Sequence, residues 1–358
     1  MKNGGSPQSL IKPTRRVIRR QLRWWLSLFC SLIALTVFAG CDHELQQPSA
    51  DLPNSVEQSV AAIRFNSGSV QSLEKLFSEL DYSWETLERG VPPFYLEKLP
   101  ADLNQSRQGK KRLFFMGLLP MILMANEEIA SEREQLLDMF ERYQSTGRLG
   151  VEEQQQLEKM AQKYRIAHAS QGEENLFERL LKRIDTIPPS LILAQAANES
   201  AWGTSRFTRE GNNLFGQWTF QAGTGIVPKN RPRGAKHEVR KFASLYDSVR
   251  SYLNNLNTHE AYLDLRNIRL ELREKGGKIS GRDLVKGLQR YSIRRDDYIA
   301  EIDQMIRYNR LGRFNSARLR SSSTSKLPAE NGQTGQGLLS TRVKLANLDT
   351  SLVDNPQL

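Results

Sequence analysis

Apolar residues recur through most of this chain at intervals of three, four and seven positions, which is the spacing of amphipathic helices. Such groups occur at residues 73–80, 129–143, 157–164, 176–184 and 298–306. The stretch 113–124, LFFMGLLPMILM, is too short for a membrane span and contains Pro120, so we expect a buried, kinked helix there. Only residues 239–245, after a segment rich in glycine and proline, alternate like a strand. The pattern predicts a mainly α protein with a small β-hairpin lobe.

The basic residues are distributed unevenly along the chain. Among its 358 residues, 51 Lys and Arg stand against 40 Asp and Glu, which gives a net charge of +11. Seven of the basic residues precede residue 24, with no acidic residue among them, and without these seven the balance is 44 to 40. A nucleic-acid partner is therefore not expected, whereas a mild positive balance suits an anionic cell wall.

An apolar run without charges, WWLSLFCSLIALTVF, fills residues 24–38 directly after that basic block. This order of a basic and an apolar segment is typical of a secretory signal. The next residues end in VFAGC, which resembles a bacterial lipobox, and Cys41 would then be the lipidated first residue of the mature protein. Asp42 resembles the signal that keeps such lipoproteins at the inner membrane. We expect a lipid-anchored periplasmic protein, and an uncleaved membrane anchor is the alternative.

Few residues suit metal, redox or nucleotide chemistry. Only two cysteines are present, and Cys30 lies within the apolar run, so no disulfide is expected in the folded part. The four histidines show no metal-ligand spacing, and no phosphate loop or dinucleotide motif appears. We expect neither a metal nor a cofactor.

A helix apolar on nearly every side is predicted after two consecutive prolines, with Ser190 as its N-cap and Gly203 as its stop. Such a helix is normally buried, yet it carries Glu199. Gln195 and Trp202 lie about one turn to either side, so the three side chains can share a face, and we expect Gln195 and Trp202 to contact the substrate. Burial raises the pKa of a carboxyl group without a basic partner, which is what a general acid requires near neutral pH. The alternative is that Glu199 merely reaches water at the helix end.

Amides and aromatic rings follow this helix directly. The segment GNNLFGQW contains Asn212, Asn213, Phe215 and Trp218. Amides can pair with sugar hydroxyls and flat rings can stack on sugar faces, so these four residues are candidate carbohydrate ligands. The two asparagines either contact sugar or fix the turn, and the two rings either stack or pack.

The sequence AQAANESAWGTSRF followed by NNLFGQW resembles the core motif of the glycoside hydrolase family 73 glucosaminidases. A second match, LQRYS at 288–292 followed by DYI at 297–299, resembles the family's late tyrosine motif, with its tyrosines one residue further apart. The resemblance covers about residues 175–310. It implies a lysozyme-like, mainly helical fold with a small β lobe over a sugar cleft.

The resemblance also implies roles for individual residues. Glu199 would be the general acid, and Tyr291 would donate a hydrogen bond to the sugar or to Glu199, with Tyr298 beside the substrate. Glu238 on the β lobe is comparable in position to a second acid proposed to orient or activate water. For Tyr291 the alternative is simple packing, and for Glu238 it is an exposed surface position.

From these features we expect a signal at 1–40, a polar tether at 41–54, a helical module at 55–174, a catalytic domain at 175–312 and a disordered tail at 313–358. The predicted function is that of a peptidoglycan hydrolase, an endo-β-N-acetylglucosaminidase whose partner is the glycan strand. A lytic transglycosylase and a non-catalytic wall-binding or scaffold protein are the alternatives. Whether water held by Glu238 or the substrate's own acetamido group completes the reaction stays open, as does the oligomeric state.

Overall fold

The computed structural model describes residues 62–106, 109–166, 172–291 and 294–320. The chain divides into two compact units, and all the elements named below belong to the unit formed by Asp51–Pro228 and Lys236–Leu358. Of the other unit, only the loop Lys229–Ala235 is among the described residues. The predicted signal, Cys41, the tether and most of the predicted tail lie outside the described residues.

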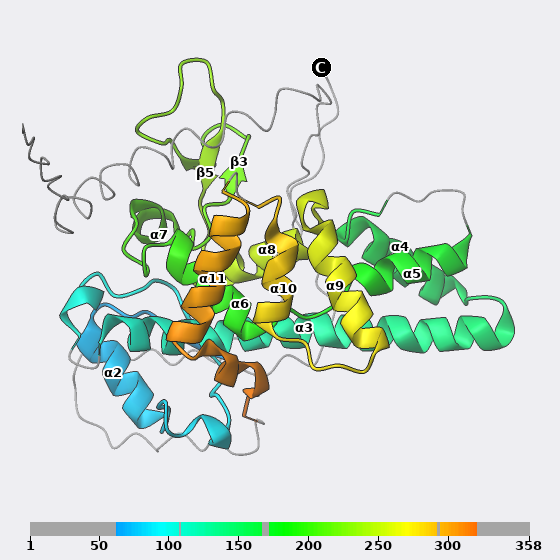
Figure 1. The fold of residues 1–358 in the computed structure, drawn as a ribbon, viewed down its shortest axis with the longest axis horizontal. Coiled ribbons are helices and arrows are strands. Elements are labelled where there is room, and N and C mark those ends of the chain that lie inside the picture. The colour runs from blue at the N-terminus through cyan, green and yellow to red at the C-terminus, as the bar shows by residue number, and fades with distance from the viewer. Residues whose placement is uncertain (1–61, 107–108, 167–171, 292–293, 321–358) are drawn as a thin grey trace, which may run out of the picture. The chain divides into compact units, whose positions relative to one another are not determined.

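Helices make up most of the described chain (Figure 1). The α-helices are α2 (Val70–Glu79), α3 (Lys110–Thr146), α4 (Val151–Lys163), α5 (Glu173–Arg183), α6 (Pro189–Glu199), α7 (Arg206–Gly211), α8 (Leu245–Thr258), α9 (Leu263–Glu274), α10 (Gly281–Leu284) and α11 (Asp296–Tyr308). Short 3₁₀ helices are η1 (Leu87–Arg89), η2 (Leu103–Gln105), η3 (Glu260–Tyr262), η4 (Val285–Leu288) and η5 (Leu311–Ser316). The strands are β1 (Ile63–Phe65), β2 (Phe94–Leu96), β3 (Trp218–Thr219), β4 (Gly225–Ile226) and β5 (Glu238–Arg240). The predicted class, a lysozyme-like, mainly α domain with a small β lobe after a helical N-terminal module, is confirmed.

The apolar stretch 113–124 lies within α3, a helix of 37 residues, and every residue of the stretch is buried. Among the described residues, α3 alone is long and apolar enough to cross a membrane, but 78% of its most apolar window is buried inside the protein. It packs against α5, α6, α8 and β2. We therefore interpret α3 as the central core helix, which joins the N-terminal module to the predicted catalytic domain in one hydrophobic core.

The β lobe is a three-stranded antiparallel sheet with strand order β3-β5-β4. Val239 in the middle strand pairs with Trp218 on one side and with Ile226 on the other. The predicted strand at 239–245 is wrong beyond residue 240, because Ser244 and Asp247 form a capping box that starts α8 at Leu245. A second, parallel pair of strands, β1 and β2, was not predicted.

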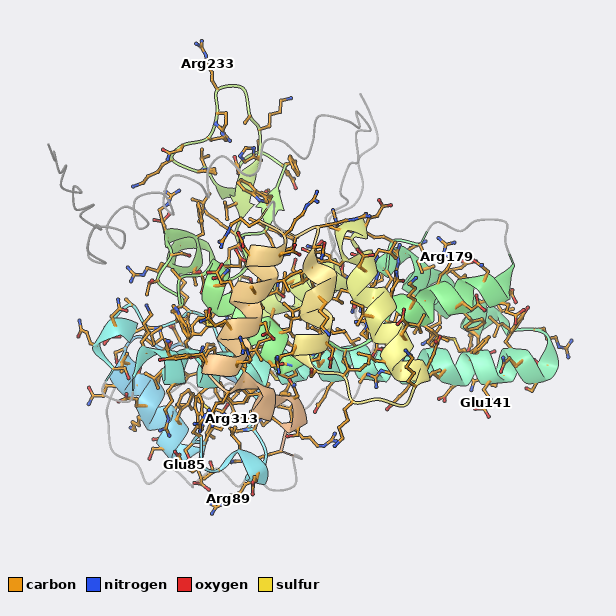
Figure 2. All side chains as sticks on the ribbon, viewed as in Figure 1. Glu85, Arg89, Glu141, Arg179, Arg233 and Arg313 are labelled. Carbon is orange, nitrogen blue, oxygen red and sulfur yellow. The ribbon has the colours of Figure 1, made fainter. Side chains whose placement is uncertain are left out.

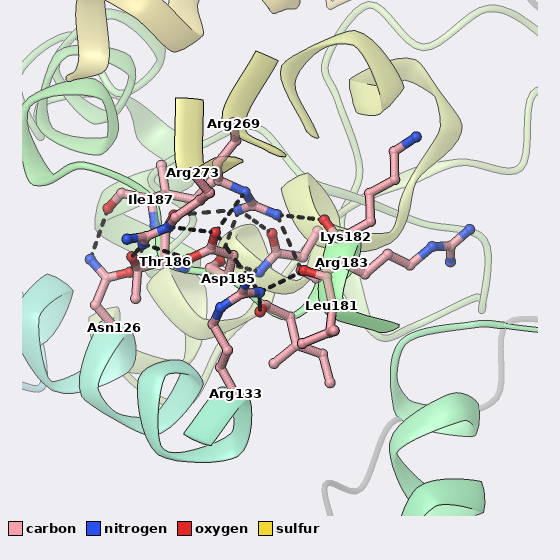
Figure 3. Close-up of polar contacts among 12 residues, drawn as sticks. Asn126, Arg133, Leu181, Lys182, Arg183, Asp185, Thr186, Ile187, Arg269 and Arg273 are labelled. Carbon is pink, nitrogen blue, oxygen red and sulfur yellow. Dashed lines mark hydrogen bonds and ion pairs between the residues drawn. The ribbon is translucent and has the colours of Figure 1, made fainter. Parts of the chain in front are cut away.

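A buried cluster of arginines fixes the segment between α5 and α6 (Figure 3). Asp185 is 2% exposed and is surrounded by Arg133, Arg269 and Arg273. Arg133 and Arg269 also donate hydrogen bonds to the main-chain carbonyls of residues 181–184, the last turn of α5 and its C-cap. A helix end leaves such carbonyls without partners, so these side chains satisfy them and hold the approach to α6 in place.

Candidate active site

Glu199 is the last residue of α6, and residues 189–197 of that helix are all buried. The predicted N-cap at Ser190 is wrong, because α6 begins at Pro189 and Pro188 occupies the cap position. Proline is favoured at a first helical position, where its missing N–H costs nothing. The main-chain N–H of Ser190 instead donates to Asn315 Oδ1 at 3.1 Å. The burial of α6 is thus as predicted. Its first turn is held by a hydrogen bond to Asn315, which is distant in sequence.

The turn after Glu199 has an unusual backbone. Ala201, Trp202 and Gly203 have φ angles of +50°, +62° and +77°, in the left-handed region that only glycine adopts without strain. A β-carbon on Gly203 would lie 2.4 Å from a methyl group of Leu99, which would have to move, and the positive φ would strain any other residue there. Strained backbone of this kind costs of order 1–3 kcal/mol per residue and is concentrated at functional sites.

This turn decides where Trp202 points. The helix has already ended, so Trp202 does not continue the face of Gln195 and Glu199 as predicted. Its ring packs against α3, with centroids 5.3 Å from Phe115 and 6.0 Å from Phe114. The structure therefore separates Trp202 from the other two predicted site residues of α6.

Tyr298 of α11 connects the polar side chains of α6. Its hydroxyl donates to Glu199 Oε1 at 2.9 Å and accepts a hydrogen bond from Gln195 Nε2 at 3.1 Å. Since the amide occupies the acceptor side of the hydroxyl, the phenolic proton points to the carboxylate. Gln195 is fully buried and hence positions Tyr298, although the sequence predicted it as a substrate ligand.

Further aromatic rings surround this group. Tyr291 stacks on Tyr298 with centroids 4.8 Å apart, and Tyr262 lies 6.1 Å from Tyr291. On the α8 side, Tyr252 stacks on Phe215 at 3.8 Å. Tyr252 and Tyr262 were not predicted, because each appears in the sequence as one more apolar position of a helix face. Both contribute to a tyrosine-rich setting around Glu199.

Two buried polar atoms of this site are left without hydrogen-bond partners among the described residues, the hydroxyl of Tyr252 and Oε1 of Gln195. One is a donor and the other an acceptor, and the side chains are neighbours that interact electrostatically. A small rotation would join them and extend the chain of donors from Tyr252 through Gln195 and Tyr298 to Glu199.

The surroundings of Glu199 raise its pKa above the ordinary carboxyl range. Burial is the main cause, and it outweighs the hydrogen bonds from Tyr298 and Tyr291, which favour the carboxylate. The negative charge of Glu301 on α11, which the sequence analysis missed, adds to the increase. Burial also raises the pKa of both tyrosines, so they stay neutral donors. The raised pKa favours the protonated form of Glu199, which is the form that can donate a proton to a bound oxygen.

Asn212 and Asn213 brace the loop between α7 and β3. Both are buried, at 4% and 1% exposure. Asn212 donates to the carbonyls of Phe242 and Ala243, and Asn213 donates to those of Gln217 and Arg240. The sequence predicted that these asparagines either contact sugar or fix the turn, and the geometry supports the second role.

Glu238 and Trp218 belong to the β lobe. The carboxylate of Glu238 is buried and accepts hydrogen bonds from the N–H groups of Gly223, at 3.2 and 3.1 Å, and of Gly225, at 2.9 Å. It therefore braces the turn between β3 and β4, and its predicted role toward water stays a prediction. Trp218 is 39% exposed on β3 and has its ring 4.4 Å from that of His237, which leaves a face available for stacking.

A helical domain that carries a half-buried glutamic acid beside tyrosines, with a small β lobe, is the arrangement that the sequence resemblance implies. The family described as mannosyl-glycoprotein endo-beta-N-acetylglucosaminidase, the glucosaminidase family, matches residues 174–311. Protein bax of Escherichia coli (strain K12) is 31% identical over 199 residues, which cover 55% of this chain and 69% of that protein. The chain belongs to the glucosaminidase family.

A solved structure, the catalytic domain of the autolysin Auto from Listeria monocytogenes, is also similar to part of this chain. It is 21% identical, and the match covers 47% of this chain and 98% of that domain with a TM-score of 0.29.

Proposed function

We propose that this protein is a peptidoglycan hydrolase, an endo-β-N-acetylglucosaminidase that cleaves the β-1,4 bond after N-acetylglucosamine. The observation that carries the proposal is Glu199, a family-motif carboxylic acid whose raised pKa and hydrogen bond from Tyr298 suit a general acid. The cell-wall substrate is supported by the motif resemblance and by the predicted export signal. The location at the inner membrane through Cys41 stays a prediction from the sequence.

In this mechanism Glu199 protonates the leaving glycosidic oxygen as the bond breaks, and an oxocarbenium-like state develops at the sugar. Tyr298 and Tyr291 then stabilise the carboxylate that Glu199 becomes, since their hydrogen bonds favour its charged form. Both carboxylate oxygens of Glu238 already accept main-chain hydrogen bonds. This occupation favours attack on the sugar by the substrate's own acetamido oxygen over attack by water held by Glu238. Water would then open the cyclic intermediate and give up a proton to the carboxylate of Glu199.

Mass spectrometry of the soluble products from purified peptidoglycan tests the proposed reaction. We expect fragments with reducing N-acetylglucosamine ends, because hydrolysis adds water across the broken bond. Fragments ending in an anhydro sugar would identify a lytic transglycosylase instead. Binding to the wall without any product would identify a non-catalytic wall-binding protein.

Tyr298→Phe should move the alkaline limb of the activity profile to higher pH. The hydroxyl favours the carboxylate of Glu199, so its loss raises the pKa of Glu199 further, and the acid stays protonated to higher pH. We also expect a lower kcat, because the carboxylate formed after proton transfer loses a donor.

The measurement is kcat as a function of pH on solubilised wall fragments. Tyr143→Phe on α3 is the matched control, since it removes a hydroxyl from a ring that packs on Phe177. An alkaline limb that stays in place, or one that moves to lower pH, would contradict a role for Tyr298 at Glu199.

A further inference from the structure

A cavity lies apart from the tyrosine-rich site. It has a volume of about 560 Å³, within the usual range of small-ligand sites. None of the tyrosines around Glu199 lines it. The lining residues come from the N-terminal module, the start of α3, the turn after α6 and the end of α11, namely Trp84, Gly109, Lys110, Lys111, Arg112, Phe115, Trp202 and Asn309.

Aromatic rings form the walls of this cavity and are held in place by other rings. Trp202 packs on Phe115 at 5.3 Å, and Trp84 packs edge-on against Phe314 at 5.4 Å. Tyr308, at the end of α11, is 79% exposed and lies close enough for the ammonium of Lys111 to sit 5.4 Å from its ring. Flat rings with fixed positions are suited to stacking against a sugar ring.

The cavity is also strongly basic. Lys110, Lys111 and Arg112 are consecutive, and Arg313 lies 4.1 Å from the Trp84 ring. Arg112 pairs with Glu85 at 3.0 Å, but no ion pair among the described residues involves Lys110 or Lys111. Figure 2 shows Glu85 and Arg313 on the same side of the molecule.

Helix stability does not explain this placement of charge. Lys110 and Lys111 open α3, where the helix dipole is positive and cations are unfavourable. Burial lowers the pKa of Lys110, and the nearby charge of Arg209 lowers it further. The protein therefore bears an electrostatic cost at Lys110 that a bound anion would relieve, whereas the Lys111 ammonium is stabilised by the Trp202 ring, whose centroid lies 4.5 Å away.

We propose that this cavity binds an amino sugar of the wall polymer together with its acidic peptide, with the sugar ring against the aromatic walls and a peptide carboxylate at Lys110 and Lys111. The choice of ligand rests on the proposed function, since peptidoglycan alternates N-acetylglucosamine with an amino sugar that carries a lactyl-linked acidic peptide. A neutral sugar would not explain the presence of Lys110 and Lys111, and a simple anion would not explain the aromatic walls. Only two residues of chain, Ser200 and Ala201, separate Trp202 in this cavity from Glu199, so the polymer would be held at two neighbouring points.

Fluorescence titration of the full-length chain, purified in mild detergent, tests the proposal with N-acetylmuramyl-L-alanyl-D-isoglutamine as the probe. Trp84 and Trp202 line the cavity, so binding should change the tryptophan emission. We expect saturable binding that Lys110→Gln/Lys111→Gln weakens about tenfold or more, because charge-assisted hydrogen bonds are lost. The matched control, Lys75→Gln/Lys275→Gln, removes two exposed lysines elsewhere and should bind as the wild type does.

Tyr308→Ala provides a second variant whose exposed side chain is not needed for folding, and it should also weaken binding. Equal affinity of the wild type and both variants, or no saturable binding by the wild type, would overturn the proposal. So would equally tight binding of a neutral N-acetylglucosamine oligomer, or full displacement of the probe by millimolar inorganic phosphate. The titration measures binding, not cleavage, so its result is independent of the proposed activity. The cavity can bind the probe in a protein that does not cleave the wall, and a protein that cleaves the wall can lack this binding.

Discussion

Replacing Glu199 by glutamine should lower the rate of wall cleavage by about 10²–10⁴-fold, the usual contribution of a general acid. Glutamine keeps the shape of the side chain and can still accept the hydrogen bond from Tyr298, but it has no proton to donate. Binding to the wall should therefore be retained. Release of soluble fragments and sedimentation with insoluble peptidoglycan measure the two properties separately.

The matched control for this experiment is Glu127→Gln. Glu127 lies on α3, outside the site, and partial burial also raises the pKa of its carboxyl group. We expect this variant to cleave the wall at the wild-type rate. Products released equally by the wild type and by Glu199→Gln would place the catalytic acid elsewhere in the protein.

The stability of the Glu199→Gln variant gives a check that the loss of activity is not a loss of fold. Because the pKa of Glu199 is raised in the folded protein, the fold favours the protonated form. The stabilising contribution is fully present below the unfolded pKa and is lost as pH rises through the folded pKa. Glutamine does not ionise, so the variant should be at least as stable as the wild type. The difference between their free energies of unfolding should grow as pH rises from the unfolded pKa of Glu199 through its folded pKa.

The sequence predicts the chemistry of the site better than its geometry. A glutamate in a helix that is apolar on all sides is visible in the sequence, and the family motif connects it with two later tyrosines. The direction of Trp202 is not visible, because it depends on two non-glycine residues in left-handed conformations immediately after the helix. Tyr252 was missed for a different reason, since a tyrosine on an amphipathic helix face has the same spacing whether it faces core or cleft.

The features of the fold that depend on residues close in sequence could be predicted, and those that depend on distant residues could not. Residue spacing predicts the burial of 113–124, and the capping box that starts α10 is formed by Ser280 and Asp283, which are only three residues apart. The first turn of α6 is bound by Asn315, which lies 125 residues away, and the roles of Asn212 and Asn213 depend on carbonyls 30 and 27 residues further along the chain. Contacts between such distant residues have no periodic signal in a single sequence.

Replacing Arg269 by alanine should lower the free energy of unfolding by about 3–5 kcal/mol, the cost of breaking a buried ion pair. Arg269 is 1% exposed and lies 3.7 Å from the carboxylate of Asp185. Burial lowers its pKa to about 10, so it is still a cation at neutral pH. Its N–H groups bind the main-chain carbonyls of Lys182, in the last turn of α5, and of Asp185, in the connection to α6, as well as Asn257 Oδ1 at 2.8 Å. Alanine would leave these acceptors buried without partners.

Comparison with Arg273→Ala separates the effect of burial on stability from the effect of charge. Arg273 forms the shorter ion pair with Asp185, at 2.8 Å, but its side chain is 44% exposed, so water can replace it. Although burial opposes ionisation, the hydrogen bond from Arg273 and the charges of Arg269 and Arg133 together hold the pKa of Asp185 below its usual range. If pairing with Asp185 alone mattered, the two alanine variants would lose similar stability in urea unfolding followed by circular dichroism.

We expect instead a much larger loss for Arg269→Ala than for Arg273→Ala, with Arg269→Lys close to the alanine variant. Lysine keeps the charge but lacks the planar set of donors that reaches several carbonyls at once. A Lys variant as stable as the wild type would show that charge rather than hydrogen bonding holds the segment before α6. The expected order would mean that the position of Glu199 depends on main-chain carbonyls bound by an arginine 70 residues further along the chain.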